Sequence, residues 1–157
     1  MIYALDTSTI SYYLRGEGRV NENFHQEIIT SGNVYTISYF SAYEIMRWLN
    51  YKPTRITQFY ATKFDLMFKN VSGLADMPGA VWDKAVEVYI ALQSKGQLIG
   101  DADILIAAYC LVNDYTLVTR NISDFNRIDG LKVVNWFCGH CHAVGLYLLS
   151  FLILQFR

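Results

Sequence analysis

Four short apolar stretches rich in β-branched and aromatic residues alternate along the chain with segments of helical periodicity. A turn signal precedes each of the last three stretches, as Gly32-Asn33 precedes the second. Strands that alternate with helices in this way are typical of a mostly parallel sheet whose faces are covered by helices. The sequence therefore predicts an α/β domain with a mostly parallel central sheet. The four predicted strands are residues 1–5, 34–38, 115–119 and 131–134.

Three segments between these strands carry apolar residues at helical spacing. Ser41 is the candidate N-cap of the first segment, which ends near Pro53. Gly96 closes the second segment, and Asp101 is the candidate N-cap of the third. The predicted helices run from residue 41 to near 53, from 82 to 96 and from 101 to 111.

The size of the chain, 157 residues and 18.0 kDa, suits a single domain with one substantial core. Its 53% hydrophobic residues exclude a disordered chain, and its net charge of -1 excludes a generally basic nucleic-acid coat. Any binding of nucleic acid must therefore be local. The N-terminal residues lack the pattern of a secretory signal, which predicts a cytoplasmic protein. The three cysteines, an odd number, give no disulfide framework.

Four acidic side chains follow the predicted strands or lie near the starts of helices: Asp6, Glu44, Asp103 and Asp124. In α/β sheets, ligands bind in a crevice beyond the carboxyl ends of the strands. Mg²⁺ and Mn²⁺ prefer oxygen ligands, and packed carboxylates raise one another's pKa values unless a cation neutralises them. The pattern predicts a divalent-cation site, whereas each acid taken singly is more typical of a helix cap or a solvated charge.

Asp101 and Asp103 are only two residues apart, so on a helix their side chains diverge. Asp101 fits the N-cap, which leaves Asp103 as the candidate ligand. Thr119 and Asn121 could support the site through hydrogen bonds, and both equally suit an ordinary turn at the end of a strand.

Each acid lies in a short motif, and two further motifs follow the last one: Leu5-Asp6-Thr7-Ser8, Ser41-Ala42-Tyr43-Glu44-Ile45, IGDADILIAA at 99–108, TRNISDF at 119–125, IDGL at 128–131 and Asn135-Trp136. Together these motifs resemble those of PIN-domain ribonucleases and, more narrowly, of VapC-type toxins from toxin–antitoxin pairs. The resemblance covers residues 1–136, and the segment 119–125 is its most specific part. In the family the third acid is the last one before Ile-Ala-Ala, which selects Asp103 over Asp101.

The resemblance implies a PIN-like fold and an endoribonuclease, a phosphodiester hydrolase that depends on Mg²⁺ or Mn²⁺. It implies that the metal ligands and catalytic residues are Asp6, Glu44, Asp103 and Asp124. It adds three supporting residues: Thr7, Thr119 and Asn121. Such toxins are usually homodimers, they cut an RNA substrate, and a cognate antitoxin protein silences them.

A second interpretation remains open beside the enzyme. The chain could be a catalytically idle module that keeps the fold, binds a protein or RNA, and uses the acids only as polar contacts. The presence of all four acids favours the enzyme.

The segment 45–70 joins basic residues to interleaved aromatic residues, which predicts a weak RNA-binding surface that includes Arg47, Lys52 and Arg55. For the aromatic residues, helix packing or a dimer interface is the more common role.

Residues 1–137 form the predicted nuclease domain, and 138–157 form an apolar tail of unknown role. The tail begins with a C-x-x-C-H pattern, yet neither haem attachment nor zinc spacing fits its context well. The pattern comprises Cys138, His140, Cys141 and His142. Residues 133–156 contain no charged side chain but are marginal in length for a membrane helix. The tail could pack on the domain, extend a dimer interface, lie on a membrane or result from a changed reading frame. We favour an apolar helix packed on protein.

Overall fold

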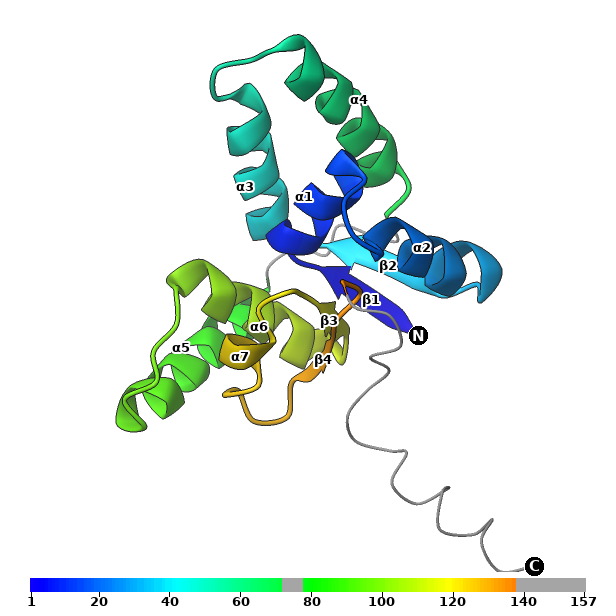
Figure 1. Cartoon of the computed structure of the whole chain (residues 1–157). Helices are drawn as coiled ribbons and strands as arrows, with labels where there is room; N and C mark the ends of the chain where they lie inside the picture. The colour runs from blue at the N-terminus through cyan, green and yellow to red at the C-terminus, as the bar shows by residue number, and fades with distance from the viewer. Residues whose placement is uncertain (72–77, 138–157) are drawn as a thin grey trace, which may run out of the picture.

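The computed structural model describes residues 1–71 and 78–137, and a four-stranded parallel sheet lies at its centre (Figure 1). The strand order is β2-β1-β3-β4, so β1 and β3 are the two central strands. The strands are β1 (Ile2–Leu5), β2 (Val34–Ile37), β3 (Thr116–Val118) and β4 (Lys132–Val134). The α/β fold with a parallel sheet that the sequence predicts is confirmed.

Helices fill the connections and cover both faces of the sheet. In Figure 1, α1 to α4 lie on one side of the sheet, and α5 to α7 lie on the other. The helices are α1 (Thr7–Arg15), α2 (Val20–Phe24), the π-helical η1 (His25–Thr30), α3 (Tyr39–Asn50), α4 (Arg55–Lys69), α5 (Gly79–Ser94), α6 (Asp101–Asn113) and α7 (Ile122–Phe125).

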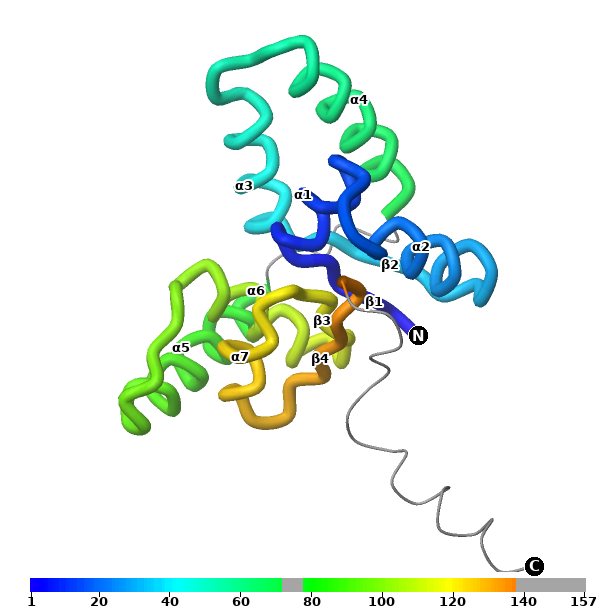
Figure 2. Tube along the Cα trace, viewed as in Figure 1, coloured from blue at the N-terminus to red at the C-terminus, as the bar shows by residue number. Residues whose placement is uncertain are grey.

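The core has two parts because side chains alternate between the two faces along each strand. Leu5 and Val118 belong to the cluster with α1 to α4, whereas Ala4 and Leu117 belong to the cluster with α5 and α6. Figure 2 shows β1 beside β3, although most of the chain separates them in sequence. This pairing brings the residue after each strand to the same edge of the sheet.

The two predicted N-caps, Ser41 and Asp101, are not the caps in the structure, and α5 begins at Gly79 and not at residue 82. Helix α3 begins earlier than expected, because Ser38 is its N-cap and its hydroxyl accepts a hydrogen bond from the Ser41 backbone N–H at 3.1 Å. Helix α6 has Gly100 as its N-cap, and the Gly100 carbonyl accepts from the Ile104 N–H at 3.0 Å. Asp101 is therefore the first helical residue, not the cap, and its side chain makes no capping hydrogen bond.

Helices α1, α2 and α4 have no counterpart among the predicted elements. Asp6 caps α1, and a reciprocal pair of hydrogen bonds between Thr54 and Thr57 forms a capping box at the start of α4. The buried face of α4 includes Phe64 and Met67. Tertiary packing of such a face stabilises a helix that sequence periodicity alone does not reveal.

The predicted tail, with its Cys and His cluster, lies outside the residues that the structure describes. In the described part of the chain, no helix has the length and apolar character needed to cross a membrane.

Candidate active site

Asp6 lies where β1 ends and α1 begins, and it is only 6% exposed. Its Oδ1 accepts hydrogen bonds from the Thr9 backbone N–H and the Ser8 hydroxyl, both at 2.8 Å. Its Oδ2 accepts one from the Thr119 hydroxyl at 2.5 Å. Burial raises the pKa of the Asp6 carboxyl above its usual value, and these hydrogen bonds oppose that rise. The carboxylate is therefore held rigidly by its donors at the edge of the sheet.

Glu44 lies on α3 and reaches the start of α1. Its Oε2 accepts a hydrogen bond from the Thr7 hydroxyl at 2.5 Å. Because Thr7 directly follows Asp6, this bond places Glu44 beside the first carboxylate. Thr7, which the resemblance implies as a supporting residue, thus positions one of the candidate acids.

Asp103 is the third residue of α6, in the turn where backbone N–H groups favour negative charge. Its pKa is raised from 3.8 to about 6, first by burial and then by the negative charges of the other three candidate acids, Asp6, Glu44 and Asp124. A negative charge raises the pKa of another carboxyl to this extent only when the two groups are close together. The four carboxylates therefore share one electrostatic neighbourhood.

Asp124 lies on the short helix α7, half-buried between two partners. Its Oδ2 accepts a hydrogen bond from Asn121 Nδ2 at 2.7 Å, and its Oδ1 lies 3.0 Å from Arg127 Nη2. Thr119 links this segment to the first carboxylate, because its hydroxyl donates to Asp6 and accepts from the Asn121 N–H at 3.0 Å. Both predicted supporting residues of the segment thus make hydrogen bonds to a candidate acid.

Some polar groups at the site were not expected from the sequence. Ser8, Thr9 and Arg127 each contact a candidate acid. A local signal exists for Thr9, since an Asp cap commonly accepts from the N–H three residues later. Arg127 follows Asp124 by three residues, which is the spacing of a helical ion pair.

Other predicted residues lie elsewhere. Asp101 is exposed and lines a cavity between α5 and α6 together with Trp82. Arg47 lies over the ring of Tyr43 at 5.5 Å. The amine of Lys52 lies over the Tyr51 ring at 5.2 Å.

Arg55 lines a cavity between α1 and α4 whose walls include Phe59. The aromatic residues of this region divide between packing and exposure: Phe64 is buried, whereas Phe59 is 66% exposed.

The donor set fits a hard divalent cation, because it consists of carboxylate oxygens whose charges repel one another. As the side chains stand, no three His, Cys, Asp or Glu side chains within residues 1–71 and 78–137 are arranged as a metal-binding group. Hydrogen bonds explain this arrangement, since Glu44 is turned to Thr7, and Asp124 to Asn121 and Arg127. The fit of this site to a divalent cation therefore rests on the oxygen ligands and their negative charges, and not on the present orientation of the side chains.

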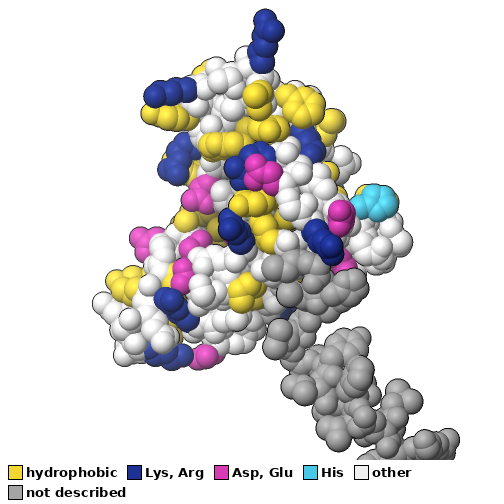
Figure 3. Space-filling view, viewed as in Figure 1, with side chains coloured by type: hydrophobic (Ala, Val, Ile, Leu, Met, Phe, Trp, Pro, Cys, Tyr) yellow, Lys and Arg dark blue, Asp and Glu magenta, His cyan; other side chains and the backbone are white. Residues whose placement is uncertain are grey.

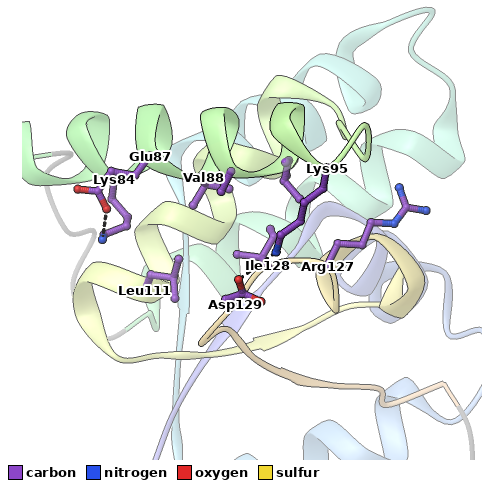
Figure 4. Close-up of a pocket in the computed structure, with 10 residues that line it drawn as sticks. Lys84, Glu87, Val88, Lys95, Leu111, Arg127, Ile128 and Asp129 are labelled. Carbon is purple, nitrogen blue, oxygen red and sulfur yellow. Dashed lines mark hydrogen bonds and ion pairs between the residues drawn. The ribbon is translucent and has the colours of Figure 1, made fainter.

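A separate cavity of about 270 Å³ lies between α5, α6 and the segment after α7 (Figure 4). Its apolar floor includes Val88 and Ile128, and Lys95 pairs with Asp129 at its rim at 3.0 Å. Arg127 lines this cavity and also pairs with Asp124. None of the four candidate acids lines it, so it is distinct from the carboxylate site.

The charge cluster predicts a pH-dependent stability of the metal-free protein. The pKa of the Asp103 carboxyl is higher in the folded state than its usual 3.8. Protonation of this carboxyl therefore stabilises the folded state. The stabilisation is fully present below pH 3.8 and is lost as the pH rises through about 6. Since Asp103 is partly exposed, solvent screening reduces the effect to roughly 1–2 kcal/mol. Urea unfolding in EDTA at about pH 4.5 and about pH 7.5 measures it. Asp103→Asn should flatten this dependence, and an unchanged dependence in that variant would contradict the assignment.

Comparison with known proteins gives consistent matches over most of the chain. A family model described as the PIN domain matches residues 3–131. The chain is 28% identical over 136 residues to Ribonuclease VapC2 of Rickettsia felis, covering 87% of this chain and 98% of that protein.

Solved structures match over a similar range. The crystal structure of VapBC2 from Rickettsia felis bound to a promoter DNA fragment matches with a TM-score of 0.75 and 28% identity, over 87% of this chain and 99% of that one. FitAcB from Neisseria gonorrhoeae matches with a TM-score of 0.74 and 21% identity, over 87% and 98% of the two chains. The second likeness concerns the fold alone.

Proposed function

Because the chain belongs to the PIN-domain family, we propose that it is a Mg²⁺- or Mn²⁺-dependent endoribonuclease and the toxin of a toxin–antitoxin pair. The observation that carries the proposal is the electrostatic neighbourhood of four carboxylates at the edge of the sheet, in which burial and then the three other acids raise the pKa of Asp103. The name of the Rickettsia felis relative, a ribonuclease, supports the choice of substrate.

The residues of the site have separate tasks in this proposal. Asp6 and Asp103 are the central ligands, and Glu44 and Asp124 complete the set. Thr119 orients Asp6 through its hydroxyl, while Asn121 and Arg127 orient Asp124. A bound Mg²⁺ or Mn²⁺ supplies a Lewis acid that orients a phosphate oxygen and lowers the pKa of a bound water.

The proposal includes two protein partners. Two solved structures with this fold are described as a member of the VapBC family of toxin–antitoxin systems and as a toxin–antitoxin complex, which supports a cognate antitoxin. An exposed apolar face on α5 supports a homodimer, because large unpartnered apolar patches commonly mark protein interfaces. The face comprises Trp82, Val86 and Ile90, which are 50%, 59% and 59% exposed.

We assign residues 1–137 as the nuclease domain, since every proposed ligand lies within them, and 138–157 as a tail of unassigned role.

Metal removal tests the proposed function. Incubation of the purified chain with end-labelled single-stranded RNA is expected to give discrete cleavage products in Mn²⁺ or Mg²⁺ and none in EDTA. Restoring the cation should restore cleavage, because the carboxylates then regain their partner. Gel electrophoresis of the RNA provides the measurement. A folded protein that binds RNA but cuts none under any of these conditions would favour the idle binding module.

A further inference from the structure

Two arginines meet around one tyrosine beside the carboxylate site. The guanidinium carbon of Arg15 lies 4.8 Å from the ring centre of Tyr12, and that of Arg120 lies 5.2 Å from the same centre. Arg120 also donates a hydrogen bond to the Tyr12 hydroxyl. Both arginines are exposed, so their charges face solvent from a fixed platform.

The platform is connected to Asp6 by short hydrogen bonds. The Arg120 backbone N–H donates to the Ser8 hydroxyl at 3.2 Å, and that hydroxyl donates to Asp6 Oδ1 at 2.8 Å. Arg15 lies at the far end of α1, roughly 13 Å along the helix axis from Asp6 at ~1.5 Å per residue. Both guanidinium groups nevertheless lie around the ring of Tyr12, which belongs to the helix that Asp6 caps.

The charges of this pair are only partly neutralised by the protein. Arg15 lies 3.5 Å from Glu17 in an exposed ion pair, which contributes little in water. In the described parts of the chain, Arg120 forms no ion pair with a carboxylate. In the face drawn in Figure 3, Lys and Arg side chains lie close to Asp and Glu side chains near the middle of the molecule. Because Arg120 is connected to Asp6 through Ser8, an anion that approaches this carboxylate meets a cation beside it.

A cavity of about 240 Å³ lies between α1 and α3, and Arg15 is one of the residues that line it. Thr7, the partner of Glu44, lies at one end of its lining, and Arg15 and Trp48 form other walls. The Trp48 ring is 37% exposed and stacks on Tyr60 with a centroid distance of 6.1 Å and an angle of 21°. The aromatic wall is therefore held in place while part of its surface stays open.

We propose that Arg15, Arg120 and Trp48 hold the single-stranded RNA substrate beside the carboxylates. The two guanidinium groups bind phosphates of the strand, and the cavity receives one unpaired base against the indole ring. Guanidinium groups suit phosphate geometry, and an exposed aromatic ring suits a base that is not paired. This inference rests on the proposed ribonuclease function, and it places RNA contacts on Arg15 of α1, Arg120 after β3 and Trp48 of α3. The predicted contacts were instead Arg47, Lys52 and Arg55.

Salt dependence of RNA binding tests the arginines. Binding of a fluorescently labelled single-stranded RNA is measured by anisotropy in EDTA, in an Asp103→Asn background, between roughly 50 and 200 mM salt. Each lost phosphate contact lowers the slope of log K against log salt by about 0.7 for a single strand, so Arg15→Gln with Arg120→Gln should lower it by about 1.4. A matched control, Arg19→Gln with Lys69→Gln, removes the same charge from two exposed ion pairs and should leave the slope unchanged.

Replacing Trp48 tests the base contact separately. Trp48→Leu is expected to weaken RNA binding about tenfold while the salt slope stays the same, because stacking does not release counterions. An unaltered affinity in a variant that is folded by circular dichroism would overturn the base contact.

The outcomes separate this inference from the proposed function. If the wild-type chain binds RNA with the expected slopes but does not cleave it, the ribonuclease is wrong and the RNA contacts stand. If the double arginine variant keeps the full slope, or the protein binds no RNA, the RNA contacts are wrong whether or not cleavage occurs. Should the double variant fail to fold, the single variants Arg15→Gln and Arg120→Gln decide, with an expected loss of about 0.7 each.

Discussion

Replacing Asp103 with asparagine is expected to reduce metal-dependent RNA cleavage roughly a thousandfold or more, because a metal site supplies several kcal/mol of charge stabilisation. The carboxamide keeps the shape of the side chain but loses the negative charge that the three neighbouring acids act upon. Asp101→Asn should retain cleavage near the wild-type rate. Asp101 is exposed, lines a different cavity, and makes no capping hydrogen bond that the change would remove.

Initial cleavage rates of a labelled RNA at saturating Mn²⁺ measure this contrast, with circular dichroism as the check on folding. The two variants are matched controls for each other, since they make the same chemical change two residues apart. Equal losses in both would show that the start of α6, and not the Asp103 carboxylate, is what cleavage requires.

The sheet was predictable because each strand carries its own local signal. The stretches 34–38 and 115–119 of the sequence contain β-branched and aromatic residues, and turn residues precede them. Their observed strands, β2 and β3, are shorter only at the ends. The parallel pairing of the strands was predicted from the alternation of strands and helices along the chain.

Helix α1 was not predicted because its stability comes mainly from outside its own sequence. Its nine residues, Thr7–Arg15, include four Ser and Thr residues, which favour caps and turns over helix interiors. What fixes the helix is the Asp6 cap and the burial of Ile10 and Leu14. Asp6 is both the N-cap of α1 and a candidate metal ligand. Its place in the sequence therefore indicated the site, and the start of the helix was overlooked.

The prediction that separated Asp101 from Asp103 relied on a helix cap that the structure does not show. Two residues of spacing do send the side chains in different directions, as expected on a helix. The cap, however, is Gly100, whose backbone conformation and carbonyl begin α6 without any side-chain oxygen.

Long-range contacts at the site could not be read from sequence spacing. The Thr119 hydroxyl reaches Asp6 only because β3 pairs with β1 in a register that sets Val118 opposite Leu5. The arginine pair at Tyr12 has the same origin, since Arg120 follows directly after Thr119. The segment 45–70 was predicted to bind RNA because its basic residues are close in sequence. Arg15 and Arg120, by contrast, become neighbours only in the fold.

The buried donors around Asp6 also bear on how the site tolerates change. Burial disfavours the charged form of this carboxyl, and three hydrogen bonds from Thr119, Thr9 and Ser8 favour it. Such a group is costly to bury without function, because an ionised carboxylate is stable inside a protein only when it is paired or bonded. Burial outweighs these bonds and leaves the pKa of the Asp6 carboxyl raised, so a nearby cation would favour its charged form.

Asp6→Asn is expected to reduce cleavage by roughly a thousandfold or more and to remove metal-dependent stabilisation, while the fold stays intact. Asparagine caps a helix as well as aspartate does, so its Oδ1 can still accept from the Thr9 N–H. The new NH₂ group would face the Thr119 hydroxyl, which can accept as well as donate a hydrogen bond. Thermal unfolding supplies a readout independent of cleavage: at a Mn²⁺ concentration about 100 times its Kd, the wild type gains about 2.7 kcal/mol and the variant gains none. Asp65→Asn, the same change at an exposed partner of Lys69, should keep both the cleavage and the gain. An Asp6→Asn protein that still shows the full Mn²⁺-dependent gain would remove Asp6 from the ligand set, and one that unfolds without metal would mean that its charge is needed for the fold.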